Sequence, residues 1–287
     1  MKEKKDKDMG AVTKFNKAAC VTQLRHVERK IKYPKNADID LDRTYQNYTL
    51  SPNRGISSYK YLIERISEIY LAPMGKYEQD RIYMSGWIIT KPKDLDNIYE
   101  RDFFEACYEF LKERYGGEKN VINASVHKDE SGEPHLHFCF IPVKKFKYTP
   151  DKNKRIALKN WKKVHEYLKD NPNATSQEAA EEIGLSRKTV ARWRRVSQEE
   201  IENLVYDPNA RGKNEKLCAK EVINRQDLQT FHQDLQSYMD KKKIPAKVYT
   251  GITKKQGGNI TVEELKRQRE YLKRHEHIED RRYEHEY

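Results

Sequence analysis

The sequence lacks the features that mark membrane and secreted proteins. No apolar run approaches the roughly 18 residues of a membrane span, and residues 1–8 carry no apolar stretch of the kind found in signal peptides. The four cysteines, Cys20, Cys107, Cys139 and Cys218, stand far apart without paired spacing. They predict neither a disulfide nor a zinc framework, and they are typical of reduced cytoplasmic proteins.

An excess of positive charge is the main feature of the composition. The chain has 57 Lys and Arg residues against 45 Asp and Glu, which gives a net charge of +12. The two signs are mixed along the chain, which indicates a folded basic protein and not a cationic tail. A polyanionic partner is expected, with nucleic acid the first choice and no membrane partner.

The most informative segment is the histidine-rich stretch from Val126 to Phe138. His135 and His137 are two residues apart, so on a strand both side chains point to the same face. Residues 131–134 favour a turn, which would return the chain toward His127. Because three neutral imidazoles suit a divalent transition metal, we expect a metal site here. The alternative is a set of surface histidines near a turn.

The acidic residues of this segment have two interpretations each. Glu130 either orients a ligand or accepts a proton from a nucleophile, and Asp129 could support the ligands from behind. Either could instead be a solvated turn residue. A bound ion would act as a Lewis acid on a phosphodiester, and imidazole ligands favour Mn²⁺ over Mg²⁺, which prefers oxygen.

Residues 176–193 match a helix-turn-helix pattern. Ala180 is small where the helices would cross, Gly184 permits the turn and Ser186 would cap the second helix. The outer face of that second helix is basic, as a major-groove recognition helix requires. Its predicted DNA contacts are Arg187, Lys188 and Arg192. The alternative is an ordinary helical hairpin.

Four segments together resemble the plasmid mobilisation and recombination proteins, the Pre/Mob or MobV class of HUH-type relaxase. They are residues 25–29 with 36–48, residues 82–90 with 114–116, residues 127–138, and residues 216–221 with 227–229. The likeness covers most of residues 10–145 and about 215–265. Gly132 makes the turn between the histidines one residue longer than is usual in the family.

The resemblance implies an α+β fold, in which flanking helices cover a central antiparallel sheet and the histidines lie on central strands. It implies an enzyme that binds an origin of transfer, nicks one DNA strand and stays attached to the new 5′ end, using Mn²⁺ or Mg²⁺. A homodimer is possible, although the chain stops soon after the shared region, so a long C-terminal dimerisation helix would be shortened or missing.

This likeness also suggests a division of the chain, with the helix-turn-helix as an insertion. We expect a disordered N-terminus (1–9), a relaxase core (10–150), an inserted helix-turn-helix (151–200), the remainder of the relaxase domain (201–260) and a charged C-terminal helix (261–287).

The likeness points to His26 as the nucleophile, through a phosphoramidate link to DNA. Tyr48 is the alternative and Tyr45 a weaker one. Three arginines are candidate phosphate contacts, namely Arg25 and Arg29 beside His26, and Arg81.

Two other functions remain open. A rolling-circle replication initiator shares the metal hairpin but usually places its catalytic tyrosine on a later helix, where Tyr148 and Tyr167 are available. A non-enzymatic DNA-binding regulator would explain the helix-turn-helix and the charge, but not the histidines.

Overall fold

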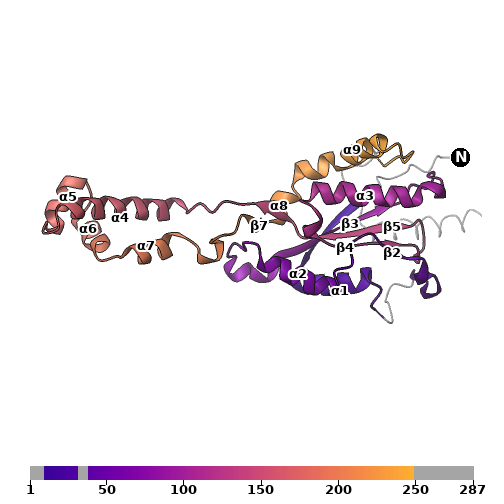
Figure 1. Cartoon of the computed structure of the whole chain (residues 1–287), viewed down its shortest axis with the longest axis horizontal. Helices are drawn as coiled ribbons and strands as arrows, with labels where there is room; N and C mark the ends of the chain where they lie inside the picture. Colours follow the sequence, from indigo (N-terminus) through magenta and orange to yellow (C-terminus); the bar gives the residue numbers. More distant parts are fainter. Residues whose placement is uncertain (1–9, 32–37, 249–287) are drawn as a thin grey trace, which may run out of the picture.

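The computed structural model describes residues 10–31 and 38–248. The predicted disordered N-terminus and charged C-terminal helix lie outside these residues. Within them, no helix is both long and apolar enough to cross a membrane. Figure 1 shows an elongated molecule, with a core built on a sheet and an arm of helices that extends from one end of it.

A five-stranded sheet forms the centre of the core, in the order β1-β3-β5-β4-β2, and each pair of neighbours is antiparallel. Its strands are β1 (Gly10–Asn16), β2 (Tyr48–Thr49), β3 (Ile82–Thr90), β4 (Val121–His127) and β5 (His135–Phe140). The expected α+β fold is confirmed, and the histidines of β4 and β5 do lie on inner strands.

Two pairs of helices cover the two faces of the sheet. Alternate side chains of a strand point to opposite faces, so Phe138 and Cys139 enter different hydrophobic cores. One face packs against α3 (Glu100–Arg114) and α9 (Arg225–Lys241), where Trp87 stacks on Phe231. The other packs against α1 (Lys17–Val27) and α2 (Ser58–Ser67), through Leu24 and Leu62.

The arm is a four-helix module with its own apolar core. It comprises α4 (Lys152–Asp170), α5 (Ser176–Ile183), α6 (Arg187–Arg194) and α7 (Gln198–Val205). The turn between α5 and α6 follows the predicted pattern, since Gly184 has a φ of +69° and the Ser186 side chain caps α6. The helical module reaches past residue 200, because Ile201 and Val205 of α7 are fully buried in the same core as Val164.

A short ribbon joins the arm to the core. It pairs β6 (Val143–Lys145) with β7 (Glu215–Leu217), so the chain leaves and re-enters the core at adjacent positions. The remaining short elements are η1 (Leu41–Gln46), η2 (Gly75–Asp80), η3 (Asn97–Tyr99), η4 (Glu118–Asn120), η5 (Pro208–Ala210) and α8 (Ala219–Val222). Because β6 follows the end of β5, the ribbon lies at the opposite end of that strand from His135.

Candidate active site

Strand register brings the three predicted metal ligands to one face of the sheet. His127 on β4 is paired with His135 on β5, and Ser125 is paired with His137. Paired residues on antiparallel strands point to the same face, here the face covered by α1. The last turn of α1 supplies a fourth imidazole, that of His26.

These four histidines form a compact cluster. His127 and His137 stand at its centre, with 4.6 Å between their ring centroids. His26 lies on one side, 5.3 Å from the His137 ring, and His135 lies 4.9 Å from that same ring. The structure thus brings the predicted nucleophile and the predicted ligands together.

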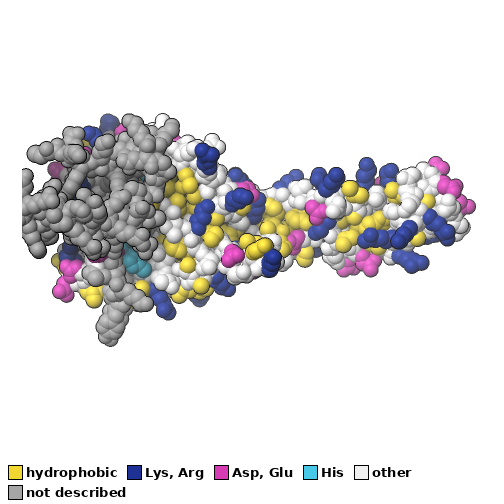
Figure 2. Space-filling view, turned by 180° about the vertical axis from the view of Figure 1, so that it is seen from behind, with side chains coloured by type: hydrophobic (Ala, Val, Ile, Leu, Met, Phe, Trp, Pro, Cys, Tyr) yellow, Lys and Arg dark blue, Asp and Glu magenta, His cyan; other side chains and the backbone are white. Residues whose placement is uncertain are grey.

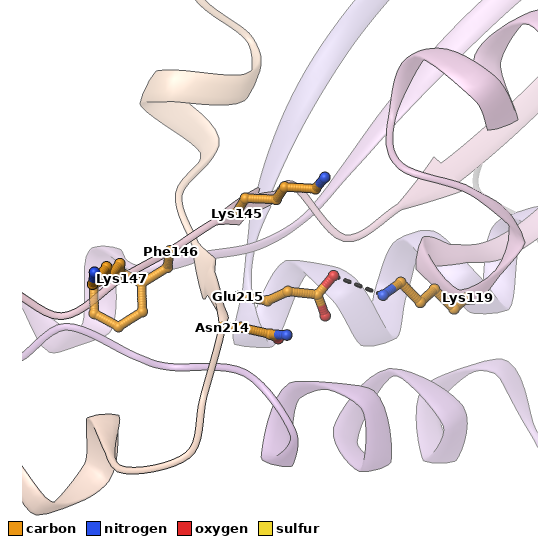
Figure 3. A pocket seen from close by; sticks show the side chains of 6 residues that line it. All are labelled: Lys119, Lys145, Phe146, Lys147, Asn214 and Glu215. Atoms are coloured by element: carbon orange, nitrogen blue, oxygen red, sulfur yellow. Dashed lines mark hydrogen bonds and ion pairs between the residues drawn. The ribbon is translucent and has the colours of Figure 1, made fainter.

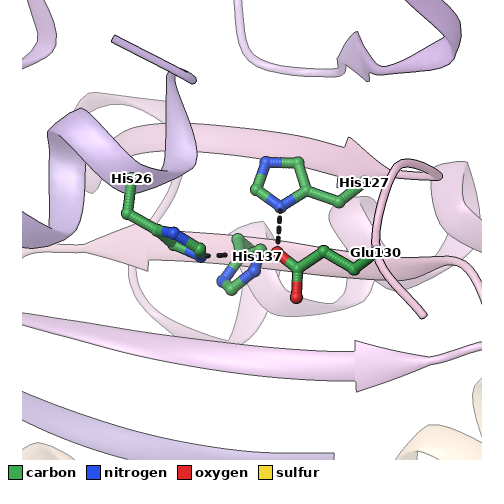
Figure 4. Close-up of side chains that lie close together, drawn as sticks. All are labelled: His26, His127, Glu130 and His137. Atoms are coloured by element: carbon green, nitrogen blue, oxygen red, sulfur yellow. Dashed lines mark ion pairs between the residues drawn. The ribbon is translucent and has the colours of Figure 1, made fainter. Parts of the chain in front are cut away.

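Glu130 reaches into this cluster from the turn (Figure 4). One of its carboxylate oxygens lies 3.6 Å from Nδ1 of His127 and 3.7 Å from Nε2 of His26. The other lies 3.9 Å from Nε2 of His135. Ligand atoms of His26, His127, Glu130 and His137 all fall within 4.8 Å of one another, a spacing that can hold a metal ion. His135 borders this group of four.

Two unpaired ring nitrogens support a metal site. Nε2 of His127 lies 2.9 Å from the Val27 carbonyl oxygen, which can only accept, so that nitrogen carries the proton. Its Nδ1 then presents a lone pair to the cluster. Nδ1 of His127 and Nε2 of His137 are buried without a hydrogen-bond partner in the described part of the chain. Orientation of a ligand imidazole by a carbonyl is common at metal sites, and the residues present therefore fit a divalent ion.

Arg29 and Asp129 form a buried pair behind Glu130. The guanidinium donates to both oxygens of Asp129, at 2.9 and 2.6 Å, and to Glu130 at 2.7 Å. The Asp129 carboxylate is completely buried and also accepts from the Thr44 hydroxyl. Arg29 adopts a φ of +51°, which is uncommon for a residue with a side chain. The pair fixes the turn that carries Glu130, so Asp129 is not a solvated turn residue.

Burial and charge set the protonation of the cluster. Burial disfavours the charged form of Glu130, but the guanidinium of Arg29, which donates a hydrogen bond to this carboxylate, favours that form, and the pKa of Glu130 is lowered to about 2. Burial, together with the positive charge of Arg29, lowers the pKa of His26, His135 and His137. Neutral imidazoles beside an ionised carboxylate are the forms that bind metals.

The alternative tyrosines are placed differently from His26. Tyr48 is paired with Val126 and packs with the core on the α3 side, the face opposite to the histidines. Burial raises the pKa of its hydroxyl well above the usual range, which disfavours the nucleophilic phenolate. Tyr45 is 82% exposed. Tyr148 donates to the Val205 carbonyl at the base of the arm, and Tyr167 lies on α4.

The predicted phosphate-binding arginines lie in different places. Arg25 is exposed in the last turn of α1, while Arg29 is occupied by the two carboxylates described above. Arg81 is buried and bound to Glu78 and the Ala72 carbonyl. It precedes β3, in which Ile88 pairs with His137 and Thr90 with His135, so Arg81 lies more than about 20 Å from the cluster along the strand. The structure does not bring Arg81 to the histidines.

Sequence reasoning missed the residues that support the cluster from a distance. Thr44 holds Asp129, and the Asn47 side chain accepts from the Lys128 backbone N–H. No periodicity in the sequence marks them, although Asn47 lies within the early motif. Both also border a groove of about 480 Å³ beside His127. Polar side chains line much of this groove, among them Ser51, Asn53, Arg54, Asn123 and Ser125.

Comparison with known proteins identifies the family to which the chain belongs. Residues 4–197 match the family model described as plasmid recombination enzyme. The chain belongs to this family. Relatives in it include the plasmid recombination enzyme type 2 of Staphylococcus aureus, 32% identical over 123 residues, which are 42% of this chain and 29% of that protein. The plasmid recombination enzyme of Lactiplantibacillus plantarum is 33% identical over 153 residues, 51% of this chain and 42% of that protein. The chain thus matches less than half the length of each relative.

Solved structures of another family member share the fold. The MobM relaxase domain, in Mn-bound crystal structures with plasmid pMV158 oriT DNA, superposes with a TM-score of 0.56 at 21% identity. The match covers 90% of this chain and 97% of that one. A second Mn-bound crystal structure of that domain with oriT DNA, at pH 4.6, gives a TM-score of 0.54 at 22% identity.

Proposed function

We propose that this protein is a relaxase, which nicks one strand at an origin of transfer and keeps the new 5′ end covalently attached. The observation that carries the proposal is the cluster of His26, His127, His137 and Glu130 on the α1 face of the sheet. A regulator that only binds DNA would have no use for buried imidazoles with unpaired nitrogens.

His127 and His137 are the ligands we expect to hold a divalent ion, with His135 as the third and Mn²⁺ as the favoured metal. The bound ion would act as a Lewis acid on the phosphate oxygens, where negative charge grows during the reaction. Arg29 and Asp129 act as positioning residues, because they hold the turn that presents Glu130.

His26 is the proposed nucleophile. Its lowered pKa keeps the ring neutral at pH 7, and its Nε2 faces Glu130. With the ring proton on Nδ1, the lone pair of Nε2 forms the bond to phosphorus, and the 3′ oxygen leaves with the electrons of the broken P–O bond and is protonated. Glu130 offsets the positive charge that the ring gains, and the Nδ1 proton is then released to solvent. The phosphoramidate retains the energy needed to rejoin the strand later.

Two surfaces are suited to the DNA. The polar groove beside His127 offers amide and hydroxyl groups to unpaired bases next to the nick. On the arm, Arg187, Lys188 and Arg192 are exposed on α6, where a recognition helix would enter a major groove. We therefore propose that the core binds a single-stranded segment and that the arm binds adjacent duplex.

The test is to incubate the protein and Mn²⁺ with supercoiled plasmids that carry candidate origins. We expect open-circular product whose 5′ end is linked to protein and whose 3′ end is a free hydroxyl. Retarded plasmid without any nick, for every origin and with either Mn²⁺ or Mg²⁺, would instead indicate a regulator.

A further inference from the structure

The region where the arm joins the core contains a pocket of about 610 Å³. Figure 3 shows the side chains around it, which come from the β6–β7 ribbon and from the turn before β4. Its lining residues are Lys119, Lys145, Phe146, Lys147, Asn214 and Glu215. We call it the neck pocket, and nothing in the nicking chemistry above makes use of it.

Positive charge prevails in the neck pocket. Its single carboxylate, that of Glu215, is neutralised by Lys119 at 2.7 Å and by Arg65 on its other oxygen. Lys145 and Lys147 are exposed, and neither has a carboxylate partner in the part of the chain that the structure describes. Two cations next to a neutralised acid favour an anionic ligand.

An aromatic ring is held rigidly among these cations. Phe146 stacks on Tyr70, with 4.6 Å between ring centroids and 11° between ring planes. Tyr70 is anchored in turn by its hydroxyl, which donates to Asp207 at 2.9 Å. Lysines beside a fixed aromatic ring are the combination by which proteins hold a nucleic-acid strand, through phosphates and a stacked base.

The position of the pocket also favours DNA as its ligand. Lys119 lies in η4 just before β4 and His127 ends β4, so the length of β4, about 20 Å, separates the pocket from the histidines. On its other side α4 extends for about 28 Å toward α5 and α6 (Figure 1). Lys and Arg side chains recur along the arm (Figure 2). The neck therefore lies on the direct line between the cluster and the recognition helix.

We propose that the neck pocket binds the DNA strand between the nick site and the duplex held by the arm. Lys145 and Lys147 contact phosphates, and Phe146 stacks on a base. The proposal rests on the proposed function, in that it assumes one DNA molecule engaged by both parts of the protein.

The first test compares the Lys145→Ala/Lys147→Ala double variant with Lys241→Ala/Lys247→Ala, which removes the same charge from exposed lysines in and beyond α9. The long probe is a duplex of about 20 base pairs with an oligo-dT extension on the order of ten nucleotides, and the short probe is the extension alone. We expect the neck variant to bind the long probe about ten- to fiftyfold more weakly near 0.1 M salt, with a salt slope smaller by about 1.5. The Phe146→Leu variant should bind the long probe roughly tenfold more weakly than the parent protein.

The second measurement needs no substitution and is unaffected by misfolding. In the parent protein, the long probe should protect Lys145 and Lys147 from acetylation, read by mass spectrometry, while Lys241 and Lys247 stay reactive. Equal losses in the neck and control variants, or unprotected neck lysines on bound long probe, would overturn the proposal. Neither readout requires nicking, so a failure of the relaxase activity would be recognised separately in the plasmid test.

Discussion

At the scale of single residues, the histidines of the cluster have different proposed roles, since His26 is the nucleophile and His127 and His137 are metal ligands. We expect His26→Ala to eliminate the covalent adduct, because the variant lacks the nitrogen that would attack phosphorus. Mn²⁺ should still bind through His127 and His137. Tyr48→Phe should retain the adduct, since Tyr48 lies on the other face of the sheet. Denaturing gels of DNA labelled at its 3′ end read the adduct, which should be acid-labile as phosphoramidates are. An acid-stable adduct lost only in Tyr48→Phe would reverse this assignment.

The ligand assignment has its own test. Saturating Mn²⁺ at about 100 times its Kd should stabilise the parent by about 2–3 kcal/mol, which raises Tm by several degrees. His137→Ala and His135→Ala should lose this stabilisation and the nicking, but should keep duplex binding, because the basic surface is intact. His165→Ala, in the arm, is the matched control and should respond to Mn²⁺ like the parent. If either variant nicked DNA as well as the parent protein, the substituted histidine would be excluded as a metal ligand.

Metal binding should also depend on pH in a defined direction. Because burial lowers the pKa of His26, His135 and His137 below about 6.5, protons compete with the metal only in more acidic solution. The apparent affinity for Mn²⁺ should be constant near neutrality and should fall as the pH drops well below 6. Titration calorimetry across this range measures it, and a loss of affinity that begins above pH 7 would contradict the assigned protonation.

The buried Arg29–Asp129 pair predicts a pH-dependent stability. Burial opposes ionisation of Asp129, but hydrogen bonds from Arg29 and Thr44 outweigh it and depress its pKa. A depressed pKa contributes stability above the unfolded value of about 3.9, and this is lost as the pH falls further. Asp129→Asn should therefore cost roughly 2–4 kcal/mol at pH 7 and much less near pH 2. Urea unfolding at both values measures this difference, and Asp42→Asn on exposed η1 is the control.

At the scale of elements, α6 is proposed to read duplex DNA. Replacing Arg187, Lys188 and Arg192 by Ala should weaken duplex binding and reduce its salt slope by about 2–3, since each phosphate contact releases about one counterion. Cutting of a short single-stranded oligonucleotide should barely change. Lys159→Ala/Lys162→Ala/Lys169→Ala, on the exposed side of α4, controls for charge. If the α6 variant bound duplex DNA as tightly as the parent protein, the arm would instead be a structural or partner-binding hairpin.

At the scale of the whole molecule, the arm is expected to be separable from the core. Each has its own hydrophobic core, and Lys145 pairs with Glu215 where the arm begins and ends. Replacing residues 149–211 by a short Gly-Ser loop should leave a folded core that cuts a single-stranded nick-site oligonucleotide and binds origin duplex poorly. Circular dichroism and a nicking assay decide the outcome, and an unfolded core would show that the arm is needed for its stability.

The sequence by itself determined the local features of this protein. The strand Ile82–Thr90 and the helix Arg225–Lys241 follow from period-two and helical patterns of apolar residues, which are visible within a single segment. The common face of His135 and His137 followed from strand geometry alone. The helices on either side of Gly184 followed from capping and turn residues. The family resemblance added the early histidine motif.

Tertiary structure alone decided which distant residues meet. His26 and Val27 reach His127 across 100 residues of chain, through packing of α1 on the sheet. The same packing turned Arg29 from a candidate DNA contact into the partner of Asp129, and the pairing of β2 with β4 put Tyr48 on the far face. The neck pocket exists only because β6 and β7 pair. Patterns along the sequence reflect the conformational preferences of residues that are close together in the chain. The contacts between distant residues depend instead on how whole helices and strands bury their apolar faces against one another.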